Sequence, residues 1–153
     1  MIEFGQEYMA QIVANAQALA AALQSRGIPM LGAHKGFTRT HQVIADVRGF
    51  GGGLVAAQKL AEANIITNKN LIPSDRAEDW DRPGGLRIGT TEVTRLGMGT
   101  AEMERIADLM AAILVGGSGP AEIKRQAIEM RSDFREVRFC FKPAPHSDPP
   151  GGS

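Results

Sequence analysis

Residues 65–97 read IITNKNLIPSDRAEDWDRPGGLRIGTTEVTRLG, and the interpretation of the whole chain starts from this stretch. It joins an apolar segment to a polar loop and then to an arginine. The strand-like triplet Leu86–Arg87–Ile88 is flanked by three glycines, Gly84, Gly85 and Gly89. Because glycine has no side chain, another molecule could approach the backbone closely on either side of Arg87. The pattern indicates a ligand site centred on Arg87.

The same residues have a plainer interpretation. An arginine in a short edge strand is most often solvated, with its aliphatic stem covering apolar surface. The local pattern alone favours this second interpretation. A resemblance that extends over most of the chain reverses the preference.

The runs NKNLIPSD at 68–75 and GGLRIGTTEVTRLG at 84–97 resemble the C-terminal domain of serine hydroxymethyltransferase, a pyridoxal-phosphate enzyme. The corresponding family segments read approximately NKNTIPFD and SGIRIGTPALTTRG. This resemblance implies that Arg87 binds the carboxylate of an amino-acid substrate. It also implies a substrate and folate loop formed by Asn68, Lys69 and Asn70, in which Asn70 contacts tetrahydrofolate.

Four more residues are expected near this site, namely His41, Thr90, Glu92 and Arg95. The position of His41 comes from TRTHQVIADVRG at 38–49, which is similar to the family segment TDNHLVLVDLR. By pattern alone, a histidine at a strand edge is more often structural than catalytic. The three histidines are scattered and offer no metal-ligand spacing, so we expect no metal.

The implied fold is α+β, the small C-terminal domain of fold-type I pyridoxal-phosphate enzymes. Its sheet has three or four mostly antiparallel strands, with helices on one face. Apolar periodicity independently predicts helices at 4–23, 54–63, 100–114 and 120–134. Thr100 is the expected cap of the third of these helices. The same periodicity predicts strands at 30–31, 42–47, 65–67 and 86–88, and a short strand or extended segment at 137–141. We expect a linker helix at 1–26, the small domain at 27–142 and a disordered tail at 143–153.

Composition excludes several classes of protein. The chain has 153 residues and equal numbers of basic and acidic side chains, 17 each, so it presents no electrostatic footprint for nucleic acid. It contains no apolar run of about 20 residues and no signal-peptide pattern. Its single cysteine, Cys140, lies in a predicted strand and has no internal disulfide partner. These features favour a cytoplasmic protein that binds neither nucleic acid nor membrane.

No lysine of this chain is expected to carry the cofactor. His34–Lys35 imitates the family's His-Lys pair, but Lys35 lies in a glycine-containing loop just after the linking helix. The resemblance therefore implies that pyridoxal 5'-phosphate is bound mainly by a partner chain carrying the large domain. We expect this chain to be inactive alone and to form a heteromeric dimer of such pairs. A truncated fragment is the other explanation, and the position of Met1 near the domain junction favours the split enzyme.

Three departures from the family pattern leave the acceptor open. Ser74 replaces a bulky residue, Trp80 lies in an unusually charged loop, and Thr91–Glu92 replaces Pro-Ala. These features resemble divergent branches that include threonine transaldolases, so folate-independent aldehyde transfer is an alternative to hydroxymethyl transfer. A non-catalytic binding or regulatory module that keeps the fold is a further alternative.

Overall fold

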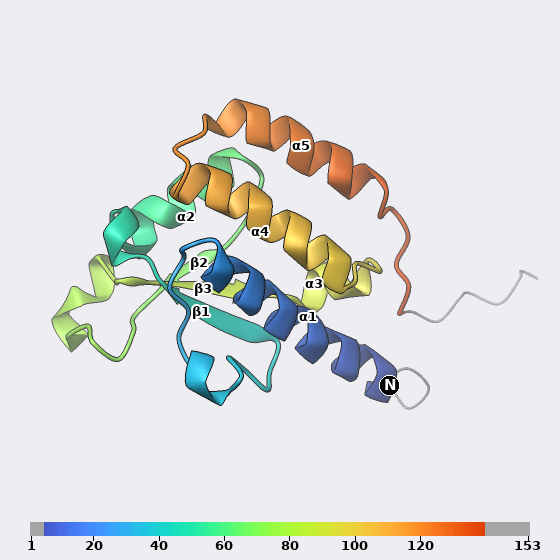
Figure 1. The fold of residues 1–153 in the computed structure, drawn as a ribbon, viewed down its shortest axis with the longest axis horizontal. Helices are drawn as coiled ribbons and strands as arrows, with labels where there is room; N and C mark the ends of the chain where they lie inside the picture. The colour runs from blue at the N-terminus through green and yellow to red at the C-terminus, as the bar shows by residue number, and fades with distance from the viewer. Residues whose placement is uncertain (1–4, 140–153) are drawn as a thin grey trace, which may run out of the picture.

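The computed structural model describes residues 5–139, which form an α+β fold (Figure 1). The helices are α1 (Gly5–Ser25), α2 (Gly52–Glu62), α3 (Thr91–Arg95), α4 (Thr100–Leu114) and α5 (Pro120–Ser132). The strands are β1 (Gln42–Asp46), β2 (Asn68–Asn70) and β3 (Gly85–Gly89), and short 3-10 helices occupy Ala33–Lys35, Arg48–Phe50 and Ala77–Asp81. The predicted fold class is confirmed.

The sheet has the order β1-β3-β2, and both pairings are antiparallel. Side chains alternate between the two faces of a strand, and the burial of β1 and β3 follows this period. Four buried residues of these strands join the main apolar core with the helices, namely Val43, Ala45, Leu86 and Ile88. The arginine of β3 therefore lies on the face away from this core.

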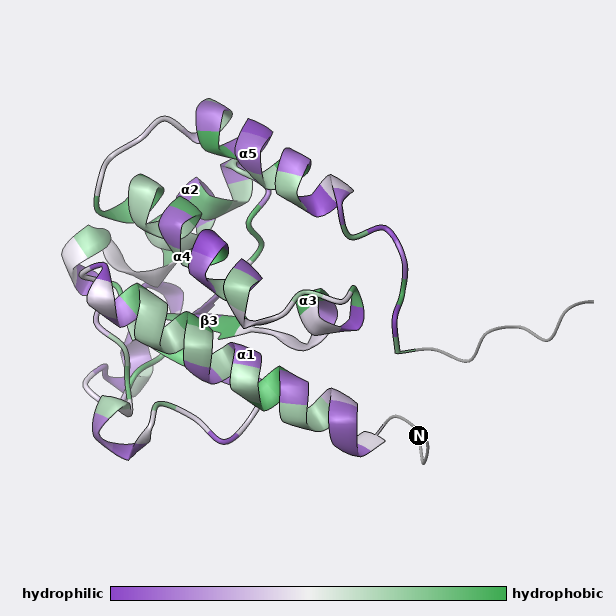
Figure 2. Ribbon diagram, turned by 45° about the vertical axis from the view of Figure 1, so that its right-hand side comes forward, coloured by the Kyte–Doolittle hydropathy of each residue, from purple (hydrophilic) through white to green (hydrophobic). Residues whose placement is uncertain are grey.

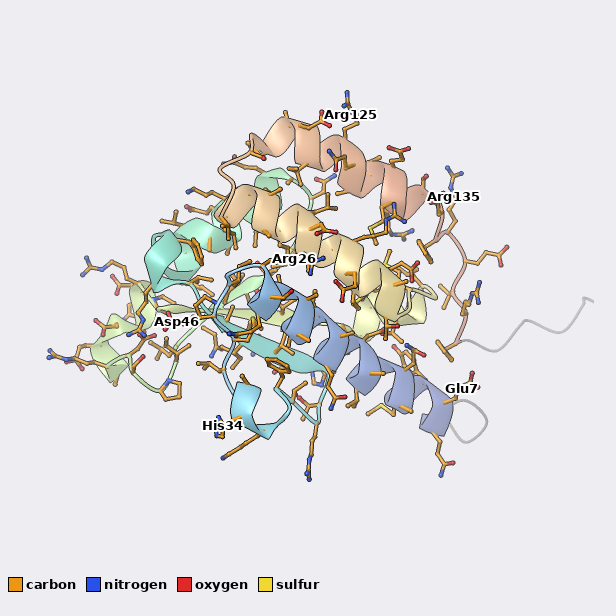
Figure 3. The ribbon with its side chains drawn as sticks, viewed as in Figure 1. Glu7, Arg26, His34, Asp46, Arg125 and Arg135 are labelled. Atoms are coloured by element: carbon orange, nitrogen blue, oxygen red, sulfur yellow. The ribbon has the colours of Figure 1, made fainter. Side chains whose placement is uncertain are left out.

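Helix α1 is amphipathic and packs its apolar stripe into the core. Most of its buried residues are spaced three or four positions apart, which places them on one face of the helix. They are Ile12, Asn15, Ala16, Leu19, Ala20, Ala22 and Leu23. Figure 1 shows α1 running alongside α4, and Figure 2 shows apolar and polar stretches alternating along both helices. Just beyond α1, Arg26 forms ion pairs with Glu104 (3.0 Å) and Asp108 (2.7 Å) of α4 (Figure 3).

A buried polar network ties α1 to the end of β3. Asn15 is fully buried, and its Nδ2 donates to Thr94 Oγ1 at 2.8 Å and to the Met98 carbonyl at 2.9 Å. Thr94 Oγ1 in turn donates to the carbonyl of Thr90, which directly follows β3. A buried amide needs such partners, because an unpaired one costs about 1–3 kcal/mol. The network fixes α1 against α3.

The prediction for the second strand was wrong by three residues. Residues 65–67 were expected in the strand, but pairing with β3 begins at Asn68. Asn64 adopts a left-handed conformation with φ of 62°, and the Ile65 N–H still donates to Leu60 of α2. The residues expected to form the strand therefore connect the turn that ends α2 to β2. Ile66 among them is 79% exposed.

Three other local features differ from what the sequence predicts. Thr100 was expected to cap α4, but the cap residue is Gly99, whose N–H donates to the Glu102 carboxylate at 2.7 Å. The short helix α3 was not predicted at all. Of the short strand or extended segment expected at 137–141, the described part, residues 137–139, forms no strand. Its remainder with Cys140 and the tail 143–153 lie outside the described residues.

The remaining elements follow the sequence pattern. Met30 forms a single antiparallel bridge with Ala45 where a short strand was expected. Pro120 begins α5, a position that suits proline because a backbone N–H in the first turn of a helix has no partner within the helix.

Within residues 5–139, no helix combines the length and the apolarity needed to cross a membrane.

Candidate functional site

The candidate site is the face of the sheet that carries Arg87, which we call the Arg87 face. In the register of the sheet, Arg87 lies opposite Ile44 of β1 on one side and opposite Asn68 of β2 on the other. Directly paired residues project to the same face of a sheet. The guanidinium is thus flanked by an aliphatic side chain and a carboxamide. Since β3 is the central strand, the alternative of an edge-strand arginine is excluded.

Arg87 has no acidic partner within the described residues. Only two arginines between residues 5 and 139, Arg26 and Arg87, are partly buried rather than exposed. Arg26 is paired with two carboxylates, whereas Arg87 forms neither an ion pair nor a side-chain hydrogen bond there. A partly buried guanidinium has five donors to satisfy, and a carboxylate matches its planar fork. The arrangement can bind an anion.

The three residues of β2 do not share one face. Asn70 pairs with Gly85, so it lies on the Arg87 face together with Asn68. The Asn70 amide donates to the carbonyl of Leu71 at 2.6 Å. Lys69 pairs with Leu86 on the opposite face, and its Nζ donates to the Asp81 carbonyl at 3.1 Å. The structure brings the two asparagines to Arg87 and directs the lysine elsewhere.

The glycines beside Arg87 do not leave space for a ligand as the sequence suggested. A Cβ at Gly85 would overlap Ile72 Cγ2 and lie 2.6 Å from the Asn70 carbonyl. A Cβ at Gly84 would lie 2.7 Å from Arg48 Cγ and 2.8 Å from a carboxylate oxygen of Asp75. Both glycines are required by packing within the domain. Only Gly89 is free of close neighbours, its nearest being the His41 carbonyl at 3.9 Å.

Sequence reasoning missed the residue that holds the two motifs together, Asp75. Its carboxylate accepts the N–H of Ile72 at 3.0 Å and the N–H of Gly84 at 2.7 Å. The loop between β2 and β3 is thereby closed at its base. The signal was present, because Asp75 is the last residue of the NKNLIPSD run, but its partner Gly84 lies nine positions later.

An ion pair flanks the loop on the β1 side. The Arg48 guanidinium binds the Asp46 carboxylate through both Nε and Nη2. This hydrogen bonding holds the pKa of Asp46 below its ordinary value, while partial burial opposes the shift. Asp46 pairs with Gly85, so the carboxylate lies on the Arg87 face at the end of the sheet (Figure 3).

The four additional residues predicted near the site lie beyond the end of the strands. The His41 carbonyl accepts the Thr90 N–H at 3.0 Å, and the His41 side chain is exposed. Thr90 is fully buried, and its hydroxyl donates to the Ile12 carbonyl of α1 at 3.0 Å. Glu92 and Arg95 form an exposed ion pair of 3.4 Å on α3.

The described part of the chain has no buried lysine. Each lysine in this range is exposed, namely Lys35, Lys59, Lys69 and Lys124. Among residues 5–139 there is no group of three or more histidine, cysteine, aspartate or glutamate side chains placed to bind a metal.

The sequence profile described as serine hydroxymethyltransferase matches residues 2–110. A serine hydroxymethyltransferase from Methanopyrus kandleri is 48% identical over 139 residues, which are 91% of this chain and 32% of that enzyme. One from Saccharolobus islandicus is 46% identical over 90% of this chain and 32% of its own length. The chain thus spans about a third of the curated relatives that it matches.

A solved structure shares the fold. The L-threonine transaldolase from Pseudomonas fluorescens aligns with a TM-score of 0.75 and 31% sequence identity, covering 87% of this chain and 29% of that one. The similarity again falls on one part of a longer polypeptide.

Proposed function

Because the chain belongs to the serine hydroxymethyltransferase family, we propose that it supplies the amino-acid-binding small domain of a pyridoxal-phosphate-dependent enzyme of that kind. The enzyme makes or breaks the Cα–Cβ bond of an amino acid and so transfers a one-carbon or aldehyde unit. The chain is active only together with the cofactor-binding domain.

One observation carries this proposal, namely the partly buried guanidinium of Arg87 on the central strand, which has no ion-pair or hydrogen-bond partner among residues 5–139. A planar guanidinium binds both oxygens of an α-carboxylate, which fixes the rotation of the amino acid about its Cα. That orientation decides which bond to Cα is aligned for cleavage. We propose that the Asn68 carboxamide, which lies opposite Arg87 in the sheet, contacts the same ligand.

Pyridoxal phosphate, when bound, supplies the electron sink into which the broken bond releases its electrons. The residues of this chain act on the substrate and not on that group. Arg87 holds the carboxylate, and the loop closed by Asp75 keeps Asn70 beside β3. The lysine that holds the cofactor comes from the other domain.

We further propose that this other domain is a partner chain and that the enzyme is a dimer of such pairs. The relatives are about three times as long as the part that this chain matches, which leaves a large domain to be supplied. A domain normally packed on a larger one should present the Arg87 face and the N-terminal part of α1 to it, with an apolar centre and a polar rim.

A threonine transaldolase is the second candidate. The structural neighbour from Pseudomonas fluorescens has that name, and Glu92 brings a carboxylate close to the end of β3 where the family pattern has alanine. In this case the acceptor is an aldehyde and tetrahydrofolate is not required.

The test is reconstitution of the full 153-residue chain with a cofactor-domain protein from the same source. We expect serine or threonine to change the visible absorption of the cofactor only when both proteins are present. Stoichiometric borohydride trapping of pyridoxal phosphate on Lys35 of the isolated chain would contradict the proposal. So would a failure of every cofactor-domain protein to bind the chain, and a non-catalytic module would then be favoured.

A further inference from the structure

A cavity of about 460 Å³ lies behind β3, between the sheet, α4 and α5. Its lining includes Ile88, whose side chain is buried on the face opposite Arg87, and the segment Ile65–Thr67 that leads into β2. Small-molecule sites have volumes of roughly 300–1,000 Å³, so the cavity is large enough for a ligand. The proposed amino-acid site does not use it.

The inner wall of this cavity is apolar. Leu19 of α1 and Met103 and Met110 of α4 line it, and all three are almost completely buried in the core. Met98 and Met130 also line it. Methionine side chains are flexible and polarizable, so such a wall adapts to aliphatic ligands of different shape.

The rim of the cavity is cationic. Arg131 and Arg135, at and beyond the end of α5, line it, and neither has an acidic partner within the described residues. Arg131 donates to the Phe134 carbonyl, and Arg135 Nε donates to the Ser132 carbonyl at 3.0 Å. Each guanidinium keeps further donors free for a ligand. No aspartate or glutamate is among the described lining residues.

An unsatisfied hydroxyl lies in the same wall. Thr67 Oγ1 is the single buried side-chain oxygen or nitrogen within residues 5–139 that has no hydrogen-bond partner. Thr67 also lines the cavity. A buried polar atom without a partner is uncommon in folded proteins, and here it belongs to a residue that lines the cavity.

From the apolar wall and the two rim arginines, which have no acidic partner among residues 5–139, we propose that this cavity binds an aliphatic monocarboxylic acid. The hydrocarbon chain lies against the methionines, and the carboxylate meets the arginines of the rim. This site goes beyond the proposed function and does not depend on it, because the wall and the rim belong entirely to this chain.

Decanoate, below its micelle-forming concentration, is the probe, and the full chain labelled with ¹³C at the methionine methyl groups is the sample. We expect saturable shifts in the signals of the four cavity methionines, Met98, Met103, Met110 and Met130. Met9, which is 56% exposed on α1 and does not line the cavity, should not shift. Decan-1-ol should bind more weakly, and decyltrimethylammonium should not bind.

Variants separate the charge of the rim from the shape of the wall. Arg131→Gln combined with Arg135→Gln should weaken decanoate binding roughly tenfold, since exposed charge pairs contribute modestly. Arg125→Gln is the matched control, because Arg125 is on the same helix, is paired with Glu122 and points away from the body of the protein (Figure 3). Ala127→Phe, which fills the cavity, should abolish binding. If that variant does not fold, the arginine pair still decides the outcome.

Equal binding of decanoate and decan-1-ol, or unchanged affinity in the double arginine variant, would overturn the assignment. Shifts of the four methionine signals that depend on protein concentration and not on decanoate would also overturn it. They would show that a second copy of the chain covers the cavity.

Discussion

Arg87 lies directly opposite Asn68 in the antiparallel pairing of β3 with β2, so a guanidinium and a carboxamide share one face of the sheet. The guanidinium can only donate hydrogen bonds, whereas the carboxamide donates and accepts. Together they suit a ligand with a carboxylate and an adjacent polar group, as an amino acid has. This pairing is the basis of the first prediction.

Replacing Arg87 by lysine should weaken amino-acid binding to the reconstituted enzyme about tenfold or more, because a charge-assisted bidentate contact contributes roughly 1.5–3 kcal/mol. Thermal unfolding of the chain should be unchanged, since Arg87 has no ion-pair or hydrogen-bond partner in the described residues. The measurement is the visible absorption of the cofactor against amino-acid concentration. Arg95→Lys is the control, and a loss of binding in that variant alone would move the carboxylate site to α3.

The effect of replacing Asn70 should show whether the enzyme uses tetrahydrofolate. If the enzyme transfers hydroxymethyl groups, tetrahydrofolate should accelerate serine cleavage, and Asn70→Ala should remove most of that acceleration. Lys69→Gln should retain it, because Lys69 lies on the opposite face of β2. The assay compares serine cleavage with and without tetrahydrofolate. Exchange of the aldehyde of threonine without folate, unaffected by Asn70→Ala, would instead support a transaldolase.

Gly85 and Gly89 should respond differently to alanine. Gly85→Ala should lower the free energy of unfolding by about 2–4 kcal/mol, because the new methyl group overlaps Ile72 and neighbouring backbone cannot easily move. Gly89→Ala should change it by less than about 1 kcal/mol, since its site is open. Urea unfolding of the isolated chain measures both. Equal effects would show that the loop between β2 and β3 is not packed as described.

The Asp46–Arg48 pair should make stability depend on pH. The pKa of Asp46 is lower in the folded chain than its ordinary value of 3.8, chiefly because Arg48 donates to it. Its stabilising contribution is therefore complete above that ordinary value and is lost as the pH falls through the folded pKa. Asp46→Asn should reduce the decrease in the free energy of unfolding between about pH 5 and about pH 2. Asp81→Asn, at a more exposed aspartate, is the control in urea titrations, and the idea fails if the two variants behave alike.

The sequence predicted the four longer helices and the central strand because their apolar residues follow regular periods. The error at residues 65–67 has a different cause. The two isoleucines there are typical of a strand. The Ile65 N–H, however, donates to the Leu60 carbonyl at the end of α2, so this backbone does not pair with β3. A polar triplet, Asn68 to Asn70, forms the strand because its backbone meets β3. Backbone pairing between distant segments is not visible in local composition.

The candidate site could be predicted only in part, because contacts between distant segments are not visible in the sequence. The position of Arg87 could be inferred from its motif, but the role of its neighbouring glycines could not. Their hydrogens face Ile72 and Asp75, and only the folded loop brings these groups together. The cavity behind β3 was missed because five separate segments line it. Met103 and Met110 of α4 are buried in the core and also form part of the cavity wall.

The buried amide of Asn15 restricts how this domain can evolve and move. Apolar helix faces can slide or rotate with small penalties, whereas Asn15 meets Thr94 and Met98 through directional hydrogen bonds. A rotation of α1 by one residue would break both bonds and leave a buried amide unpaired. Substitutions at positions 15 and 94 should therefore be correlated among functional variants. A displacement imposed on α1 from outside would be transmitted as a rigid shift of α3 and the end of β3.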